Sequence, residues 1–275
     1  MKKLFIFAVL LLAFSVAFVA CNKDNDGKDS GIVGTWIGSV DYHYPRITFK
    51  KDGTYEWMWD GIAKFKDNGT YTYENGTVVM TVKAIYEFND EGDGNGKWDK
   101  CEDMINEYFN GVRRCKVTEV VSGGALFIEI ENDYFAGGDW LVCREGFKQD
   151  LKKSDLAGTW EKADETTGTR MVLGSDGKYT KYEWWYNVEN GSKLVVAKYV
   201  GTWSIKQSTL TIDEKTLYQS YKRVGSNEYE YYNVNATTLE ADKWESQSLS
   251  YGPEDSFVVF ANGKLYMHES VFTKK

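Results

Sequence analysis

Apolar and polar residues alternate over many short stretches of this chain, the pattern of β-strands that bury one face. The alternation is clear in Ile47 and Phe49 and continues through Tyr55, Trp57 and Trp59. In the first half of the chain it predicts eight strands, near 34–42, 45–50, 54–60, 69–74, 77–83, 112–120, 125–131 and 139–144.

Turn sequences separate these predicted strands. They are Lys51-Asp52-Gly53, Asn68-Gly69, Glu74-Asn75-Gly76 and Ser122-Gly123-Gly124, and each combines residue types that favour tight turns. Eight short antiparallel strands in sequence indicate an all-β fold, an up-and-down barrel. A β-sandwich is the alternative architecture.

The second half repeats this organisation less regularly. Its predicted strands lie near 158–163, 169–174, 177–186, 199–206, 208–213, 216–224, 228–234, 256–261 and 264–272. Asn262-Gly263 predicts a type I′ turn between the last two, whereas residues 235–255 show no clear pattern. Residues 146–155, which carry three lysines, are interpreted as a linker.

Sequence landmarks recur in the same order in both halves. Gly34-Thr35-Trp36 returns as Gly158-Thr159-Trp160, and Asp52-Gly53-Thr54-Tyr55 returns as Asp176-Gly177-Lys178-Tyr179, both 124 residues later. A third pair, at 69–71 and 201–203, is offset by 132 residues. Ordered landmarks at a nearly constant offset indicate duplication of one domain, so we expect one domain over 31–145 and a second over 156–275.

The landmarks resemble those of the lipocalin-like domains of bacterial envelope lipoproteins. The resemblance lies in Gly-x-Trp on the first strand, an Asp-Gly-x-Tyr hairpin and a Gly-Thr-Tyr or Gly-Thr-Trp strand, and it covers both predicted domains. It implies two tandem eight-stranded barrels. It also implies that Trp36 and Trp160 pack under the closed end of each barrel and serve as structural residues.

The first 30 residues have the pattern of a lipoprotein leader. Lys2 and Lys3 precede an apolar run up to Ala20, which predicts a signal peptide over 1–20. The sequence from Phe18 to Cys21 resembles a lipobox, which implies lipid (palmitate) attachment at Cys21 in the outer membrane of a Gram-negative cell envelope. A plain signal peptide followed by a chance cysteine is the alternative. Residues 21–26 resemble an export signal, which implies exposure at the cell surface; a solvated tail is the alternative reading of these six residues. Residues 21–30 are polar and predict a tether.

Composition excludes one class of partner. Without Lys2 and Lys3 the chain carries 31 basic and 41 acidic residues, a formal charge of −10, which disfavours nucleic acid. Cys101 and Cys115 are the closest cysteines in sequence after Cys21 and are the leading disulfide candidates, since an envelope is oxidising; pairings with Cys143 remain open.

One acidic segment has the spacing of a calcium-binding loop. Oxygen-bearing ligands fall at positions 1, 3, 5, 7, 9 and 12 of a loop with glycine at position 6, as in an EF-hand. These positions are Glu91, Asp93, Asn95, Lys97 (through its carbonyl), Asp99 and Glu102. We therefore expect a structural Ca²⁺ and a following helix over 99–110. The alternative is an acidic surface turn.

No catalytic constellation is recognisable in the sequence. Neither His43 nor His268 has a metal-binding partner at useful spacing, so we expect no enzyme. The expected function is binding of a small apolar or amphipathic ligand, or a glycan, with four tryptophans as ligand candidates: Trp57, Trp59, Trp184 and Trp185. The alternative is a protein-interaction or inhibitor module with filled barrel cores, in contact with an envelope protein partner.

Overall fold

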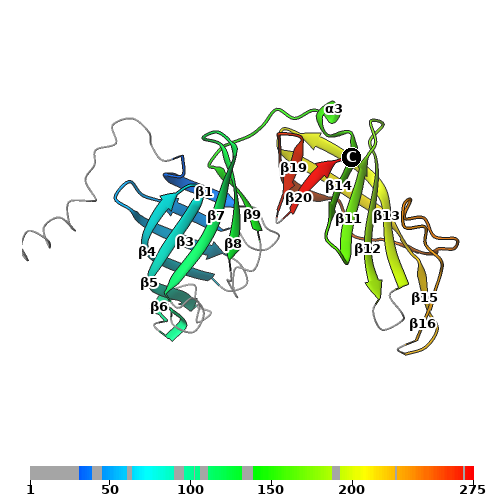
Figure 1. Ribbon diagram of the computed structural model, residues 1–275, viewed down its shortest axis with the longest axis horizontal. Coiled ribbons are helices and arrows are strands. Elements are labelled where there is room, and N and C mark those ends of the chain that lie inside the picture. Colours follow the sequence, from blue (N-terminus) through cyan, green and yellow to red (C-terminus); the bar gives the residue numbers. More distant parts are fainter. Residues whose placement is uncertain are drawn as a thin grey trace, which may run out of the picture. The chain divides into compact units, whose positions relative to one another are not determined.

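The computed structural model describes residues 31–38, 45–60, 64–89, 96–101, 103–105, 111–131, 139–187, 193–226, 228–268 and 270–275. The predicted signal peptide, Cys21 and the tether lie outside them. The described part is almost entirely β-structure, and it forms two closed antiparallel barrels of eight strands each (Figure 1). Among the described residues, no helix has the length and apolar character needed to cross a membrane.

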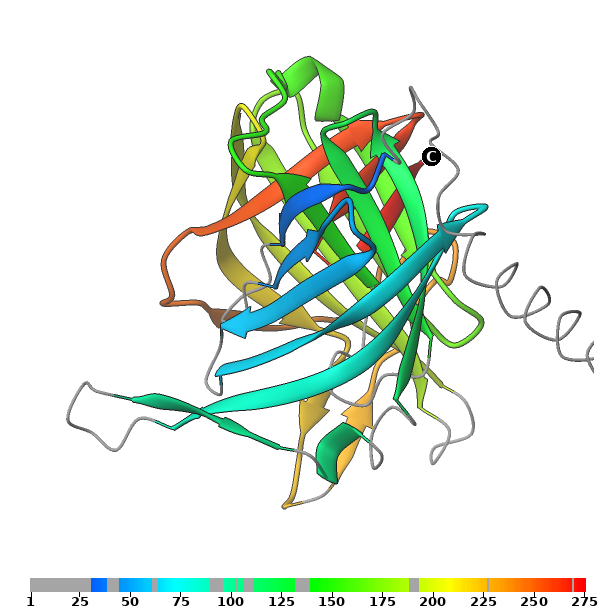
Figure 2. The same ribbon diagram turned by 90° about the vertical axis from the view of Figure 1, so that its left-hand side faces the viewer.

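The first barrel is an up-and-down barrel. Its eight wall strands are β1 (Gly34–Gly38), β2 (Arg46–Phe49), β3 (Thr54–Asp60), β4 (Lys64–Glu74), β5 (Thr77–Asn89), β7 (Val112–Val121), β8 (Ala125–Glu131) and β9 (Asp139–Arg144). Each strand pairs with the next, and β9 pairs with β1 to close the ring. The far end of β5 pairs with a short extra strand, β6 (Lys97–Lys100), and Figure 2 shows this hairpin extending past the barrel wall.

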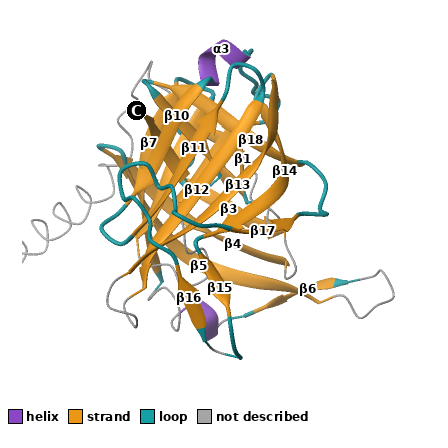
Figure 3. Ribbon diagram, turned by 90° about the vertical axis from the view of Figure 1, so that its right-hand side faces the viewer, coloured by secondary structure: helices purple, strands orange, loops and turns teal. Residues whose placement is uncertain are grey.

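The second barrel repeats this topology. Its wall strands are β10 (Gly158–Ala163), β11 (Thr167–Leu173), β12 (Lys178–Asn187), β13 (Lys193–Lys206), β14 (Thr209–Gln219), β18 (Glu254–Ala261), β19 (Lys264–Met267) and β20 (Ser270–Lys274). Three strands lie outside the ring: β15 (Tyr221–Arg223) pairs with β16 (Tyr229–Tyr231), and β17 (Glu245–Ser248) pairs with the end of β14, as β6 does with β5. Figure 3 shows these strands in orange.

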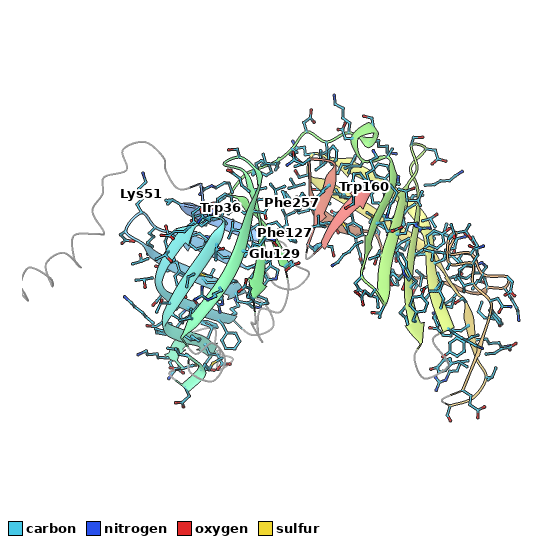
Figure 4. All side chains as sticks on the ribbon, viewed as in Figure 1. Trp36, Lys51, Phe127, Glu129, Trp160 and Phe257 are labelled. Atoms are coloured by element: carbon cyan, nitrogen blue, oxygen red, sulfur yellow. The ribbon has the colours of Figure 1, made fainter. Side chains whose placement is uncertain are left out.

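Both barrels are closed at the end that carries the Gly-x-Trp landmark. Trp36 and Trp160 are completely buried, and Figure 4 shows each within its own barrel. A cation from the last strand covers each indole: the Arg144 guanidinium lies 3.9 Å above Trp36, and Lys274 Nζ lies 5.2 Å above Trp160. The repeated landmark therefore marks the same packing in both barrels.

The predicted linker is part of the second barrel from Gln149 onward. The Gln149 amide group pairs with both backbone groups of Phe260, at 3.0 and 2.9 Å. A one-turn helix, α3 (Lys153–Leu156), follows, and Leu151 and Leu156 are buried in the core of the second barrel. Burying these two leucines fixes the segment against the closed end.

Three predictions about strands were wrong. Asn68-Gly69 is no turn but lies inside β4, at an irregularity of the β4–β5 register. A Cβ at Gly69 would overlap the Thr81 carbonyl, so only glycine allows the two strands to come this close.

Two predicted strand boundaries in the second half also differ from the structure. The predicted strands 208–213 and 216–224 are one continuous strand as far as Gln219. The predicted strand 264–272 is broken at His268, whose φ of 49° places it in a turn.

Candidate functional site

The second barrel has a cavity at its mouth, the end opposite Trp160. Its volume is about 430 Å³, within the range of small-molecule sites. Six of its ten described lining residues are polar: Lys162, Asp164, Thr167, Thr169, Glu183 and Ser270. We call this space the mouth cavity. Its other lining residues are Ala163, Gly168, Trp184 and Trp185, so the cavity combines polar groups with aromatic surface.

Two of the four predicted ligand tryptophans lie at this cavity. Trp184 and Trp185 both border it, although neighbouring residues of a strand point to opposite faces. The Trp184 ring covers Gly168, where a Cβ would overlap it. Trp185 shares its face of β12 with Glu183, so it stands on the inner face of the barrel and offers the cavity an aromatic surface.

A charged cluster lies deeper, behind Glu183. Lys181 Nζ contacts Glu214 Oε1 at 2.9 Å and Glu183 Oε1 at 3.3 Å, and it lies 4.1 Å above the Tyr199 ring. Burial lowers the pKa of Lys181, but the two carboxylates outweigh burial and the pKa is raised. Lys181 therefore stays charged and holds Glu183 in place at the cavity wall.

The rim of the cavity carries a fixed negative charge. Asp164 Oδ1 accepts hydrogen bonds from the backbone N–H groups of Thr166 and Thr167, both at 2.7 Å. These bonds lower the pKa of Asp164 to about 2, because they stabilise the carboxylate form. On the neighbouring strands β10 and β20, Lys162 Nζ donates to Ser270 Oγ at 3.1 Å. Hydrogen-bond donors and acceptors thus both line the cavity.

In the first barrel, the interior at the level of the mouth cavity is filled by the other two ligand candidates, Trp57 and Trp59. The Trp57 and Trp59 rings pack against Trp140, with centroids 5.0 and 4.9 Å apart. The Arg113 guanidinium lies 4.3 Å from the Trp57 ring and forms a buried ion pair with Asp67 at 3.0 Å. Trp57, which is only 3% exposed, is thus part of the interior packing.

The strand registers show which residues replace this packing in the second barrel. Trp57 pairs with Asp67 as Lys181 pairs with Tyr199, so Trp57 and Lys181 occupy equivalent positions. By the same offset of 124 residues Trp59 corresponds to Glu183. Polar side chains of the second barrel therefore stand where the first has two indole rings.

The last strand contributes the largest difference in volume. Trp36 pairs with Arg144 and Trp160 with Lys274, so β9 and β20 are offset by 130 residues. Trp140 therefore corresponds to Ser270. A fully buried indole in the first barrel is replaced by a hydroxymethyl group at the cavity wall. The mouth cavity thus borders the position that this ring fills in the first barrel.

A second concavity, of about 640 Å³, lies on the outer face of the second barrel. Its charged groups are engaged with one another: Glu161 contacts Arg170 Nε at 2.8 Å and Lys275 Nζ at 2.9 Å. The Tyr182 hydroxyl donates to Glu240 at 2.6 Å. Tyr182 is the one aromatic residue in the described lining of this concavity, whereas two tryptophans border the mouth cavity.

The predicted calcium loop is described only in part. Glu91, Asp93, Asn95 and Glu102 lie outside the described residues. Lys97 and Asp99 belong to strand β6, and Asp99 accepts a hydrogen bond from Asn89 at 2.7 Å. The predicted helix over 99–110 is therefore wrong at its start, although residues 103–105 are helical. Among described side chains, no group of three potential ligands is placed to hold a metal ion; calcium binding stays a prediction.

The predicted Cys101–Cys115 disulfide is not formed. Cys101 is a free thiol, and its backbone N–H bonds to Ile85 on β5, whereas Cys115 pairs with Val78 of the same strand. Seven residues of β-strand span about 23 Å, but a disulfide requires Cα atoms within about 7 Å. The extension of β5 beyond the barrel separates the two cysteines, which their short sequence separation did not reveal.

No protein-family model matches this chain, and no curated protein sequence matches it either.

Proposed function

We propose that this protein is a non-catalytic, lipid-anchored envelope protein that binds a glycan at the mouth of its second barrel. The observation that carries the proposal is the mouth cavity, which combines the Trp185 face with charged and hydroxyl groups. A sugar ring has apolar C–H faces and a periphery of hydroxyl groups. An aromatic face beside hydrogen-bonding side chains suits both features.

The polar lining favours a glycan over an apolar ligand. An apolar molecule would remove water from the Asp164 and Glu183 carboxylates without offering hydrogen bonds in return, and such desolvation is costly. Sugar hydroxyl groups donate to carboxylates and accept from Lys162. The proposed ligand is therefore polyhydroxylated, with enough C–H surface to stack on an indole.

The alternative, an interaction module with a filled core, is favoured by the first barrel alone. Its interior at the level of the mouth cavity is occupied by three indole rings and a buried ion pair. We propose that this barrel serves as a structural or protein-binding module, while the second binds the ligand. In this arrangement the two functions belong to different halves of the chain.

A printed glycan array tests the proposal, with Ser270→Trp as the decisive variant. This substitution places in the second barrel the indole that fills the first, and we expect it to abolish binding while the circular dichroism spectrum is retained. Ser175→Trp is the matched control, because Ser175 is exposed in the turn at the closed end of the same barrel. Wild-type protein that binds no glycan, or Ser270→Trp protein that binds normally, would refute the proposal.

A further inference from the structure

A short two-stranded ribbon beside the second barrel carries three tyrosines on one face. β15 and β16 pair so that Tyr221 faces Tyr231 and Arg223 faces Tyr229. Because alternate residues share a face, these three tyrosines lie on the same side. We call β15 and β16, with this face, the aromatic ribbon. A ribbon of this length is marginal alone, so its position depends on what anchors it.

The anchor is Ser220, at the junction between β14 and the ribbon. Ser220 is completely buried. Its hydroxyl accepts a hydrogen bond from Val196 N at 2.8 Å, its N–H donates to Val196 O at 3.0 Å, and its carbonyl accepts from Tyr232 N at 2.9 Å. The start of β15 is thereby tied to β13 of the barrel wall, and the residue after β16 is tied to Ser220, which gives the aromatic face a fixed place.

The aromatic face is continuous with the mouth cavity. Trp185, which lines the cavity, contacts the Tyr221 ring at a centroid distance of 6.5 Å. Tyr221 in turn contacts Tyr229 at 5.7 Å and Tyr231 at 6.1 Å, all within the range of aromatic pairs. Tyr229, the last ring of this series, is 44% exposed. The rings form a surface leading from the cavity to solvent.

We infer that the aromatic ribbon extends the mouth cavity into a longer site, which holds further sugar units of a neutral oligosaccharide chain. The inference rests on the proposed function and adds the length and charge of the ligand. A chain whose first unit occupies the cavity would continue over Trp185 and Tyr221 toward Tyr229. Each ring presents an apolar face and, in the tyrosines, a hydroxyl group at its edge.

The charges of the ribbon favour a neutral chain. Arg223 stands on the aromatic face, but its guanidinium donates to the carbonyls of Gly225, at 3.0 Å, and Ser226. Lys222 and Glu230 face each other on the opposite side. A third cation, Lys193 Nζ, lies 5.9 Å from the Tyr231 ring as its cation–π partner. An acidic chain would have to displace these contacts to pair with a cation, whereas a neutral chain requires only the rings.

Glycan length provides the test. Matched neutral and acidic series from disaccharide to hexasaccharide, printed on one array, are compared for wild type, Tyr229→Ala, Tyr229→Phe and Lys222→Ala. We expect a neutral hexasaccharide to bind wild type more tightly than its disaccharide. Tyr229→Ala should weaken hexasaccharide binding by about 3- to 10-fold, the effect of one aromatic contact, and leave the disaccharide unchanged. Tyr229→Phe and Lys222→Ala should behave as wild type.

The outcomes separate this inference from the proposed function. If wild type binds no glycan of any length, the proposed function fails and the inference falls with it. If short and long chains bind equally, or Tyr229→Ala is silent, the extended site is wrong while glycan binding stands. Preference for the acidic series would refute the neutral chain. Binding of an unstructured peptide library through Tyr229, with no dependence on glycan length, would assign the ribbon to a protein partner.

Discussion

Removing the buried cation of the first barrel should destabilise that barrel by several kcal/mol. Arg113 and Asp67 form an ion pair at 3.0 Å, and their side chains are only 5% and 11% exposed. Arg113→Met keeps most of the side-chain volume against Trp57 but leaves the Asp67 carboxylate buried without its partner. Breaking a buried pair from one side costs about 3–5 kcal/mol, so we expect a loss of this size.

The double variant separates the ion pair from the packing. Asp67→Asn combined with Arg113→Met removes both charges. We expect this double variant to be more stable than Arg113→Met alone by about 2 kcal/mol or more, because the unpaired, buried Asp67 carboxylate is the main source of destabilisation in the single variant. Native-state hydrogen exchange, read by mass spectrometry on peptides of β5 and β7, measures the free energy of opening in this barrel. Peptides of β12 and β13 provide the internal reference.

Two results would refute this reasoning. An Arg113→Met loss below about 1 kcal/mol, the size of an exposed pair, would mean that water reaches Asp67 in the native state. A double variant no more stable than the single would mean that the methionine packs badly against Trp57. In that case the ion pair would contribute little, and the interior of the first barrel would depend on shape alone.

Three further outcomes are expected. Labelling with radioactive palmitate should mark the wild type and not Cys21→Ala; unlabelled wild type would refute the lipid anchor. Ca²⁺ should raise the melting temperature, by about 2.7 kcal/mol of stabilisation at 100-fold excess over Kd, and Glu102→Ala should remove the response; a melting curve indifferent to both Ca²⁺ and chelator would refute the site. Iodoacetamide should modify Cys101 in the folded protein but Cys115, 1% exposed, only after denaturation; recovery of a Cys101–Cys115 disulfide from native protein would contradict the structure.

Local patterns were sufficient for most of the fold. The predicted strands 54–60, 125–131 and 139–144 agree with β3, β8 and β9 at both ends, because alternation and turn residues are both local signals. The predicted turn at Asn262-Gly263 is confirmed by φ values of 53° and 73°. These features depend on neighbours in sequence, which the chain displays directly.

The wrong predictions depended on residues distant in sequence. The predicted break between strands 208–213 and 216–224 does not occur: β14 continues through Glu214, which contacts Lys181 inside the barrel. Asn68-Gly69 was predicted as a turn, but Gly69 permits close approach of the Thr81 carbonyl on the neighbouring strand. Only the three-dimensional pairing shows which role a glycine or a charge has.

The mouth cavity was likewise hidden because it arises from a difference between the two barrels. Sequence patterns marked tryptophans in both halves as ligand candidates, since large aromatic side chains serve packing and recognition equally well. The strand registers separate these roles: Trp140 fills the first barrel, and its counterpart Ser270 lines a cavity in the second. The two barrels share a topology and a closed end with a buried tryptophan, Trp36 or Trp160. A substitution at the opposite end alters the interior without disturbing the closed end, and this is why one barrel can be packed with indole rings there while the other, with the same topology, has a cavity.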